Sequence, residues 1–189
     1  MANLEPLIQS IPVAPLKLAS LEGCRTLADQ VNNYLVSFRH ESPTNVGQDD
    51  SLQGYCADSY LLECECPRFG SGEGKGVLKE SVRGCDLFIM VDVTNYSLTY
   101  RVNGYENHMS PDNHYQDLKR IISAADGKAR RINVIMPFLY EGRQHKRSKR
   151  ESLDCALMLQ ELVDMGVSNI LTFDAHDPRV SNSIPLHGF

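Results

Sequence analysis

The sequence lacks the features that mark membrane, secreted and nucleic-acid-binding proteins. No apolar run approaches the roughly 20 residues that a membrane helix requires, and the first residues do not combine a basic start with an apolar secretory core. The formal net charge of -5 argues against a role on bulk nucleic acid, which usually needs a positive surface. We therefore expect a cytoplasmic protein that binds neither membrane nor nucleic acid and holds any anion in a local cluster.

Two further motifs are missing. The six cysteines contain no paired C-x-x-C motif, so we predict neither a zinc knuckle nor a dense disulfide framework, and expect most of them to be reduced and several to be buried. The glycine-rich stretch from Gly70 to Gly76 lacks the lysine-plus-hydroxyl ending of a phosphate loop. It is then either a hairpin connection, which we favour, or a loop that approaches a ligand.

Short apolar strands alternate with helices along most of the chain. A hydrophobic content of 42% over 189 residues is enough to build a core, and crossover helices between apolar strands predict a parallel sheet covered on both faces. Such sheets bind ligands at the carboxyl ends of their strands. The expected strands are 16–19, 60–66, 86–91, 132–136 and 169–173.

The helices and insertions follow from capping residues and breakers. Ser20 can cap a helix, Asp112 can cap a second, and a third runs from about 152 to 165. The first helix should bury Leu27, Val31, Tyr34, Leu35 and Phe38, and the third Leu153, Leu157, Leu162 and Val163. We expect a surface loop at about 41–58 and a projecting hairpin within about 97–110, where Asn103-Gly104 is turn-prone.

A basic loop follows the strand at 132–136. It is the only dense basic cluster of this acidic chain, and its side chains could cradle a polyphosphate through charge-assisted hydrogen bonds. A solvated basic loop is the alternative with about even odds, and the position at a strand end favours binding. The cluster comprises Arg143, Gln144, His145, Lys146, Arg147, Lys149 and Arg150.

A carboxylate and an imidazole follow the strand at 169–173, in the sequence Asp174-Ala175-His176-Asp177. Asp174 could anchor Mg2+ directly or through water, and His176 could bind the metal or contact phosphate. The alternative is a turn stabilised by aspartate, with a structural histidine.

Four blocks in fixed order resemble the ribose-phosphate pyrophosphokinases, or PRPP synthetases. The block at 80–89, a Glu-Ser-Val-Arg-Gly turn entering an Asp-aliphatic-Phe-Ile strand, is the most specific, and Arg150-Glu151 adds a further match. The resemblance implies a three-layer sandwich similar to the phosphoribosyltransferase-like fold, with a small hairpin insertion. The other blocks are 68–73, Arg143-Gln144 and Asp174-Ala175-His176.

The resemblance also implies a reaction and roles. In this family the β,γ-diphosphate of ATP passes to ribose 5-phosphate in the presence of Mg2+, giving PRPP and AMP for nucleotide biosynthesis. Arg143, Gln144 and His145 would then contact ATP, while His176, the implied catalytic residue, and Asp174 would lie at the metal-bound phosphates. Phe69 and Glu73 would approach adenine from a neighbouring subunit of a homo-oligomer, although Phe69 could equally be ordinary core.

The sequence departs from the family pattern in three ways. Ser71 stands where the family usually has an aspartate before Gly-Glu. His145 stands where the family has the aspartate of its Arg-Gln-Asp sequence. The sequence ends at residue 189, before a second α/β domain with the sugar-phosphate site, so we expect it to be the amino-terminal, ATP-binding half of a longer enzyme. Residues 1–15 would be an extension, and 16–189 a domain that is inactive alone. Two alternatives stay open: a non-catalytic regulatory subunit of a synthetase, and a nucleotide-binding module unrelated to PRPP.

Overall fold

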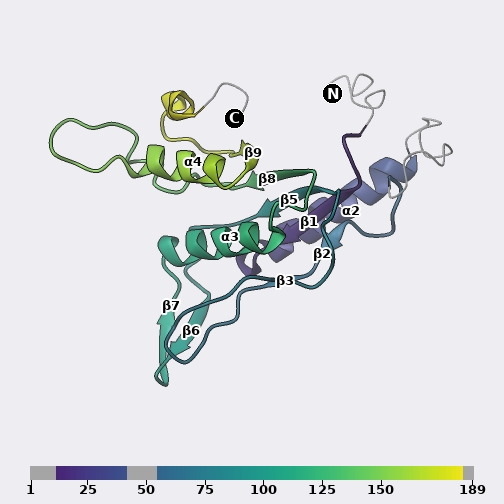
Figure 1. Cartoon of the computed structure of the whole chain (residues 1–189), viewed down its shortest axis with the longest axis horizontal. Coiled ribbons are helices and arrows are strands. Elements are labelled where there is room, and N and C mark those ends of the chain that lie inside the picture. The colour runs from purple at the N-terminus through teal and green to yellow at the C-terminus, as the bar shows by residue number, and fades with distance from the viewer. Residues whose placement is uncertain (1–11, 42–54, 185–189) are drawn as a thin grey trace.

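The computed structural model describes residues 12–41 and 55–184. Its centre is a parallel sheet of five strands in the order β2-β1-β5-β8-β9. Figure 1 shows this sheet between helices, which confirms the predicted α/β class. The strands are β1 (Leu16–Ser20), β2 (Leu61–Leu62), β5 (Asp86–Met90), β8 (Arg131–Ile135) and β9 (Val167–Leu171).

Helices cover the sheet unequally. The long helix α2 (Arg25–Glu41) follows a short 3-10 turn, η1 (Glu22–Cys24), and forms a small core with β1 and β5. The opposite face carries α3 (Pro111–Ala125) and α4 (Asp154–Asp164), whose buried residues belong to the main core. The last described element is a second 3-10 helix, η3 (Pro178–Ser183). The main hydrophobic core therefore lies between the sheet and the α3/α4 layer.

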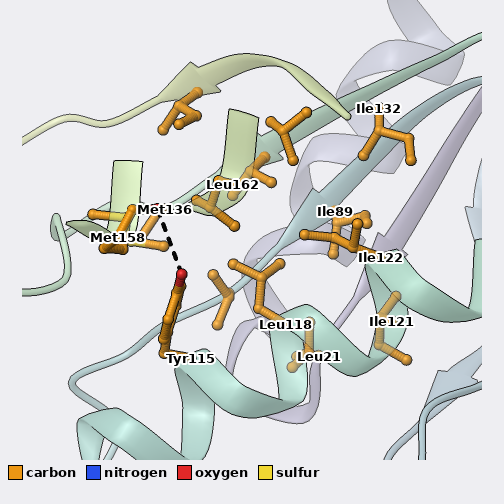
Figure 2. Packing of buried hydrophobic residues seen from close by; sticks show 14 of the residues in the cluster. Leu21, Ile89, Tyr115, Leu118, Ile121, Ile122, Ile132, Met136, Met158 and Leu162 are labelled. Atoms are coloured by element: carbon orange, nitrogen blue, oxygen red, sulfur yellow. Dashed lines mark hydrogen bonds between the residues drawn. The ribbon is translucent and has the colours of Figure 1, made fainter. Parts of the chain in front are cut away.

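The main core forms because alternate strand positions face the same helices. Leu118, Ile121 and Ile122 of α3 belong to one buried cluster with Ile89 of β5 and with Met158 and Leu162 of α4. Figure 2 shows Ile121 and Met158 on opposite sides of this cluster. Burial of each such side chain stabilises the fold by about 1.5–3 kcal/mol. The Tyr115 hydroxyl donates to the Met158 carbonyl and to Glu161, so the polar atom of this aromatic ring is satisfied.

The residues around the start of β5 explain why the block at 80–89 is so restricted. Gly84 has a φ of 71°, a conformation that glycine adopts without steric cost. Asp86 is 6% exposed and accepts hydrogen bonds from Arg131 and Asn133 of the neighbouring strand β8. A buried carboxylate needs such partners, so this block fixes the pairing of β5 with β8.

Two antiparallel pairs project from the sheet. β3 (Cys64–Glu65) pairs with β4 (Val77–Leu78), and a bridge between Arg68 and Gly74 extends the pairing, so the hairpin interpretation of the glycine-rich stretch is confirmed. β6 (Thr99–Val102) pairs with β7 (Tyr105–His108) through Asn103 and Gly104, both at positive φ. That turn matches the short type I′ hairpin which this dipeptide favours.

Helix beginnings differ from the predictions. Ser20 does not cap α2, because its hydroxyl donates to the Leu21 carbonyl and a 3-10 turn intervenes. Asp112 does not cap α3 either: Ser110 accepts from the Asn113 amide, Pro111 occupies the first turn, and Asp112 accepts from the Tyr140 hydroxyl instead. Pro fits the first turn because it lacks an amide hydrogen.

Three other predictions need correction. Leu157 is 59% exposed and Tyr34 is 64% exposed, because α4 and α2 each bury a narrower stripe than their apolar residues suggest. β9 begins and ends two residues earlier than predicted. The expected strand at 60–66 divides into β2 in the main sheet and β3 in the first projecting pair.

The remaining sequence predictions concern cysteines, termini and membrane helices. Cys24, Cys64, Cys85 and Cys155 are buried free thiols, as expected, and Cys56 is exposed. Most of the extension at 1–15 and most of the loop at 41–58 lie outside the described residues. Among the helices that are described, none has an apolar stretch long enough to cross a bilayer.

Candidate functional site

The loops after β8 and β9 run side by side beyond the sheet. Pro137 accepts hydrogen bonds at 3.1 Å from the amides of Phe173 and Asp174, and Phe138 forms a parallel bridge to Asp174. The strand pairing therefore continues past the end of the sheet, so the basic loop and the Asp-Ala-His corner emerge at the same edge. That shared edge is what the sequence predicts for neighbouring parallel strands.

The basic loop begins with a tight turn. Glu141 has a φ of 54°, the Gln144 amide donates to the Glu141 carbonyl, and the Gln144 side chain donates to the Ser152 carbonyl at 2.5 Å. Arg143, at the centre of this turn, is exposed. Within residues 12–41 and 55–184, no ion pair involves the cations Arg143, Lys146, Arg147, Lys149 and Arg150.

His145 joins the two loops. Its ring centre lies 5.2 Å from that of His176, with the ring planes tilted by 51°. Its Nε2 lies 3.3 Å from an Asp177 carboxylate oxygen, and its side chain is only 9% exposed. The structure therefore brings His145, His176 and Asp177 together, and no sequence pattern predicts the contact between His145 and Asp177.

Asp177 is itself held in place by hydrogen bonds from Arg179, two residues further along the chain. It caps η3 by accepting from the Arg179 amide at 2.9 Å, and its two carboxylate oxygens also accept from the Arg179 guanidinium. These hydrogen bonds hold the pKa of Asp177 below its usual range, and His145 adds a smaller electrostatic effect in the same direction. The carboxylate beside His145 is thus ionised near neutral pH.

Asp174 and His176 face solvent at the edge of the two loops. The backbone of Asp174 is fixed by Pro137 and Leu139, so its exposed carboxylate projects from a constrained position. In the part of the chain that the structure describes, no three histidine, cysteine or acidic side chains gather closely enough to hold a metal ion. The exposed side chains of Asp174 and His176 suit Mg2+ that is bound together with phosphates and waters, because such an ion needs only one or two protein ligands. They do not suit a metal ion that is surrounded by protein ligands alone.

Three acidic residues, Glu141, Asp154 and Asp112, interact electrostatically at the start of the basic loop. Burial raises the pKa of Glu141, and the negative charges of Asp154 and Asp112 raise it further. Burial and the hydrogen bond to Asp112 likewise raise the pKa of the Tyr140 hydroxyl. These carboxylates give the loop a negative base, so its positive charge is concentrated at the exposed side chains.

Phe69 and Glu73 lie elsewhere. Their loop connects β3 with β4 and contacts the turn between β6 and β7, where the Asn103 amide donates to the Gly70 carbonyl. In Figure 1 this region and β9 lie on opposite sides of α3. Phe69 is 54% exposed, which rules out the core alternative within this chain. The structure therefore does not bring these two residues to the Asp174–His176 corner of the same molecule.

A cavity of about 280 Å3 lies beside the β6–β7 hairpin, away from the strand ends that carry the basic loop and the Asp-Ala-His corner. Asp117 forms part of its wall, is 4% exposed, and accepts two hydrogen bonds from Arg68 at 2.7–2.8 Å and one from Arg120 at 2.6 Å. Its carboxylate is fully paired. Other lining residues include Arg25, Cys66, Tyr100 and His114.

Two residues in contact with this pair of loops, Asp177 and Arg179, were given no role by the sequence patterns. The only available signal was local: an Asp-Pro-x pattern, in which aspartate caps a turn and proline occupies its first position. That pattern predicts the bond from the Arg179 amide to Asp177. It does not predict the contact with His145, which depends on the adjacency of β8 and β9.

Comparison with known proteins gives one consistent result. The family described as the N-terminal domain of ribose phosphate pyrophosphokinase matches residues 16–166. Proteins named ribose-phosphate pyrophosphokinase from Corynebacterium ammoniagenes and Bacillus cereus are 29% identical over 175 residues, which is 90% of this chain and 44% of each relative. The chain thus spans less than half the length of these relatives.

A solved structure has the same fold. The phosphoribosylpyrophosphate synthetase of Mycobacterium smegmatis superimposes with a TM-score of 0.66 at 23% identity, over 89% of this chain and 45% of the other. The expected architecture is therefore confirmed by a protein with low sequence identity.

Proposed function

This chain belongs to the ribose phosphate pyrophosphokinase family as its amino-terminal domain, and from that premise we propose that it is the ATP-binding half of a diphosphotransferase. The full reaction would transfer the β,γ-diphosphate of ATP to ribose 5-phosphate, giving PRPP and AMP. Proteins of that name are its relatives over 90% of its length. Because the chain spans only 44% of them, the sugar phosphate would bind to residues outside this domain.

One observation carries the proposal: the ring of His145 from the basic loop lies 5.2 Å from the ring of His176. The two loops therefore form one surface, with cations that make no ion pair among the described residues on one side and an exposed carboxylate and imidazole on the other. Arginine binds phosphate oxygens in a bidentate manner, and Mg2+ is bound by carboxylate oxygens together with phosphates. A metal-bound triphosphate meets both requirements.

We assign roles from exposure. Arg143 and Gln144 would bind ATP from the basic loop, with Arg143 contributing charge and Gln144 a polar side chain near the backbone turn. Asp174 and His176 would hold Mg2+, and His176 would contact the transferring phosphates. When bound, Mg2+ would neutralise negative charge that develops on the diphosphate during transfer.

The adenine contacts would come from a second copy of the chain. Phe69 and Glu73 lie on an exposed loop at the β6–β7 side of the molecule, and an exposed aromatic ring can stack on a purine. We therefore propose a homo-oligomer in which this loop reaches the strand-end site of a neighbour. The separation of the two sets of residues within one chain supports that arrangement.

A non-catalytic regulatory subunit is the second candidate. The Ser71 hydroxyl donates to a Glu73 carboxylate oxygen at 2.8 Å. Ser71, which departs from the family pattern, therefore engages one oxygen of the side chain that would contact adenine. This contact favours weakened or altered base recognition. A regulatory subunit would bind Mg-ATP poorly, or bind it without transfer, and would change the activity of a separate synthetase.

The deciding experiment measures AMP and PRPP formed from ATP and ribose 5-phosphate by the full-length protein that contains this domain. We expect both products in equal amounts, and loss of both in His176→Ala. Asp126→Asn, on an exposed turn far from the strand ends, is the matched control. A folded full-length protein that forms neither product, yet alters the rate of an active synthetase when mixed with it, would establish the second candidate instead.

A further inference from the structure

Nδ1 of His145 is a buried polar atom without a partner. Among the described residues it is the only buried side-chain nitrogen or oxygen that makes no hydrogen bond. An unpaired buried polar group destabilises a fold, and a leucine or methionine would fill the same space without this cost. Packing alone therefore does not explain an imidazole at this position. This points to a role at the adjacent His176.

The other ring nitrogen is oriented by a fixed carboxylate. Asp177 is anchored as the cap of η3 and by the Arg179 guanidinium, and Nε2 of His145 faces it at 3.3 Å. A carboxylate at that position favours a proton on Nε2, and this selects the tautomer and the ring orientation. Arg179, Asp177 and His145 thus form a chain of contacts that ends at the ring of His176.

We propose that His145 and Asp177 are a positioning pair that sets the orientation of the His176 ring for metal-bound phosphate. The proposal rests on the role given to His176 under the proposed function. Neither residue of the pair needs to touch the nucleotide: the His145 side chain is 9% exposed and that of Asp177 is 14% exposed. His145 therefore acts through His176 and not as the direct ATP ligand that the sequence resemblance implies.

The pair also gives a physical account of a departure from the family pattern. Where the family sequence has a carboxylate after Arg-Gln, this chain has His145, and the structure supplies a carboxylate to the same corner from Asp177 on the adjacent loop. We infer that the two residues function as a unit, so that replacing one without the other removes the support of His176.

The first test is spectroscopic and uses this chain alone. Long-range 1H–15N correlation spectra of the imidazole groups report the tautomer of each ring. We expect His145 to carry its proton on Nε2, and Asp177→Asn to change the signals of both His145 and His176. Asp126→Asn is the control, because it makes the same chemical change on a remote exposed turn. Unchanged His176 signals in Asp177→Asn would overturn the proposal, whatever the activity of the full-length protein.

The second test is kinetic and uses the full-length protein. Asp177→Asn and His145→Gln should each lower kcat about 10- to 100-fold, as expected for residues that orient a metal-site ligand, while KM for ATP changes less than about threefold. The double variant should be no slower than the slower single variant, because either substitution alone already removes the interaction between His145 and Asp177. Additive losses, or a loss confined to KM for ATP, would contradict a positioning pair.

The two tests separate this proposal from the proposed function. If the full-length protein forms no PRPP but the spectra show that Asp177 controls both histidines, the positioning pair stands and the reaction assignment fails. If PRPP forms and the spectra of His176 do not respond to Asp177→Asn, the reaction stands and the pair is rejected. Urea unfolding of each variant verifies that the compared proteins are folded.

Discussion

Arginine side chains are used in opposite ways on the two sides of α3. On the hairpin side, Arg68 and Arg120 both donate to Asp117, and the Arg68 and Asp117 side chains are 9% and 5% exposed. On the strand-end side, Arg143 and the cations that follow it are exposed. An arginine with a buried carboxylate partner therefore stabilises this fold, while arginines that share an exposed loop are available to an anion.

Removing the charge of Asp117 should have the largest effect on the stability of the fold. Asp117→Asn should lower the free energy of unfolding by about 3–5 kcal/mol, because two arginine side chains lose their buried counter-ion. Urea denaturation followed by circular dichroism measures the change. Asp126→Asn, whose carboxylate is exposed beside Lys128, should stay within about 0.5 kcal/mol of the parent. Equal losses in the two variants would mean that the Asp117 cluster contributes no special stability.

The Cys66 thiol reports on the same buried cluster. Burial, reinforced by the charge of Asp117, raises the pKa of this thiol from 9.0 to about 12. Because thiolate is the reactive form, Cys66 should react with iodoacetamide at pH 8 roughly a thousand times more slowly than a thiol with a pKa of 9.0.

Mass spectrometry of digested samples measures this rate residue by residue. Cys56, which is exposed, provides the internal comparison. In Asp117→Asn the labelling of Cys66 should become faster, because the charge that disfavours the thiolate is gone and the cluster opens more often. Rapid labelling of Cys66 in the parent protein would show that the cluster is open in solution.

Arg143→Ala tests the other side of the comparison. The dissociation constant of Mg-ATP should rise about tenfold or more, because a charge-assisted contact to phosphate is lost, while the free energy of unfolding stays within about 0.5 kcal/mol. Isothermal calorimetry measures the first quantity and urea denaturation the second. A variant that loses stability and keeps its affinity would place Arg143 among the structural arginines instead.

Lys149→Ala should have the smallest effect. This exposed lysine lies further along the basic loop, so it should contribute through long-range attraction and change the dissociation constant of Mg-ATP about twofold. The difference from the parent should disappear as the salt concentration rises from about 0.05 to 0.5 M, because salt screens exposed charges. A salt-independent loss as large as that of Arg143→Ala would mean that Lys149 contacts phosphate directly.

Some elements of the fold were predictable because local and global signals agree. The mostly apolar run at 86–91 favours a strand buried on both faces, and Asn103-Gly104 favours a tight hairpin turn. Helix beginnings were less predictable, because Ser20 and Asp112 are good caps that the tertiary structure uses differently. Leu157 shows the same limit: its apolar character satisfies the helix pattern, although no described neighbour buries it.

The location of the site was predictable and its internal contacts were not. Parallel strands place their following loops at one edge, so the proximity of the basic loop to His176 follows from the sequence pattern. The contact between His145 and Asp177 requires the adjacency of β8 and β9 together with a specific turn at η3. Pairing of Arg68 with Asp117 was equally hidden, because it joins a hairpin loop to a helix that lies far along the sequence.

The strand order β2-β1-β5-β8-β9 has a consequence for the growing polypeptide. The pairing of β1 with β2 and β5 involves only residues up to Met90, while the cluster around His176 is built entirely from residues after Ile135. On the ribosome, the amino-terminal strands are therefore synthesised before the side chains of the basic loop and His176 exist. The part of the sheet to which β8 and β9 are added is thus made before the side chains of the candidate site.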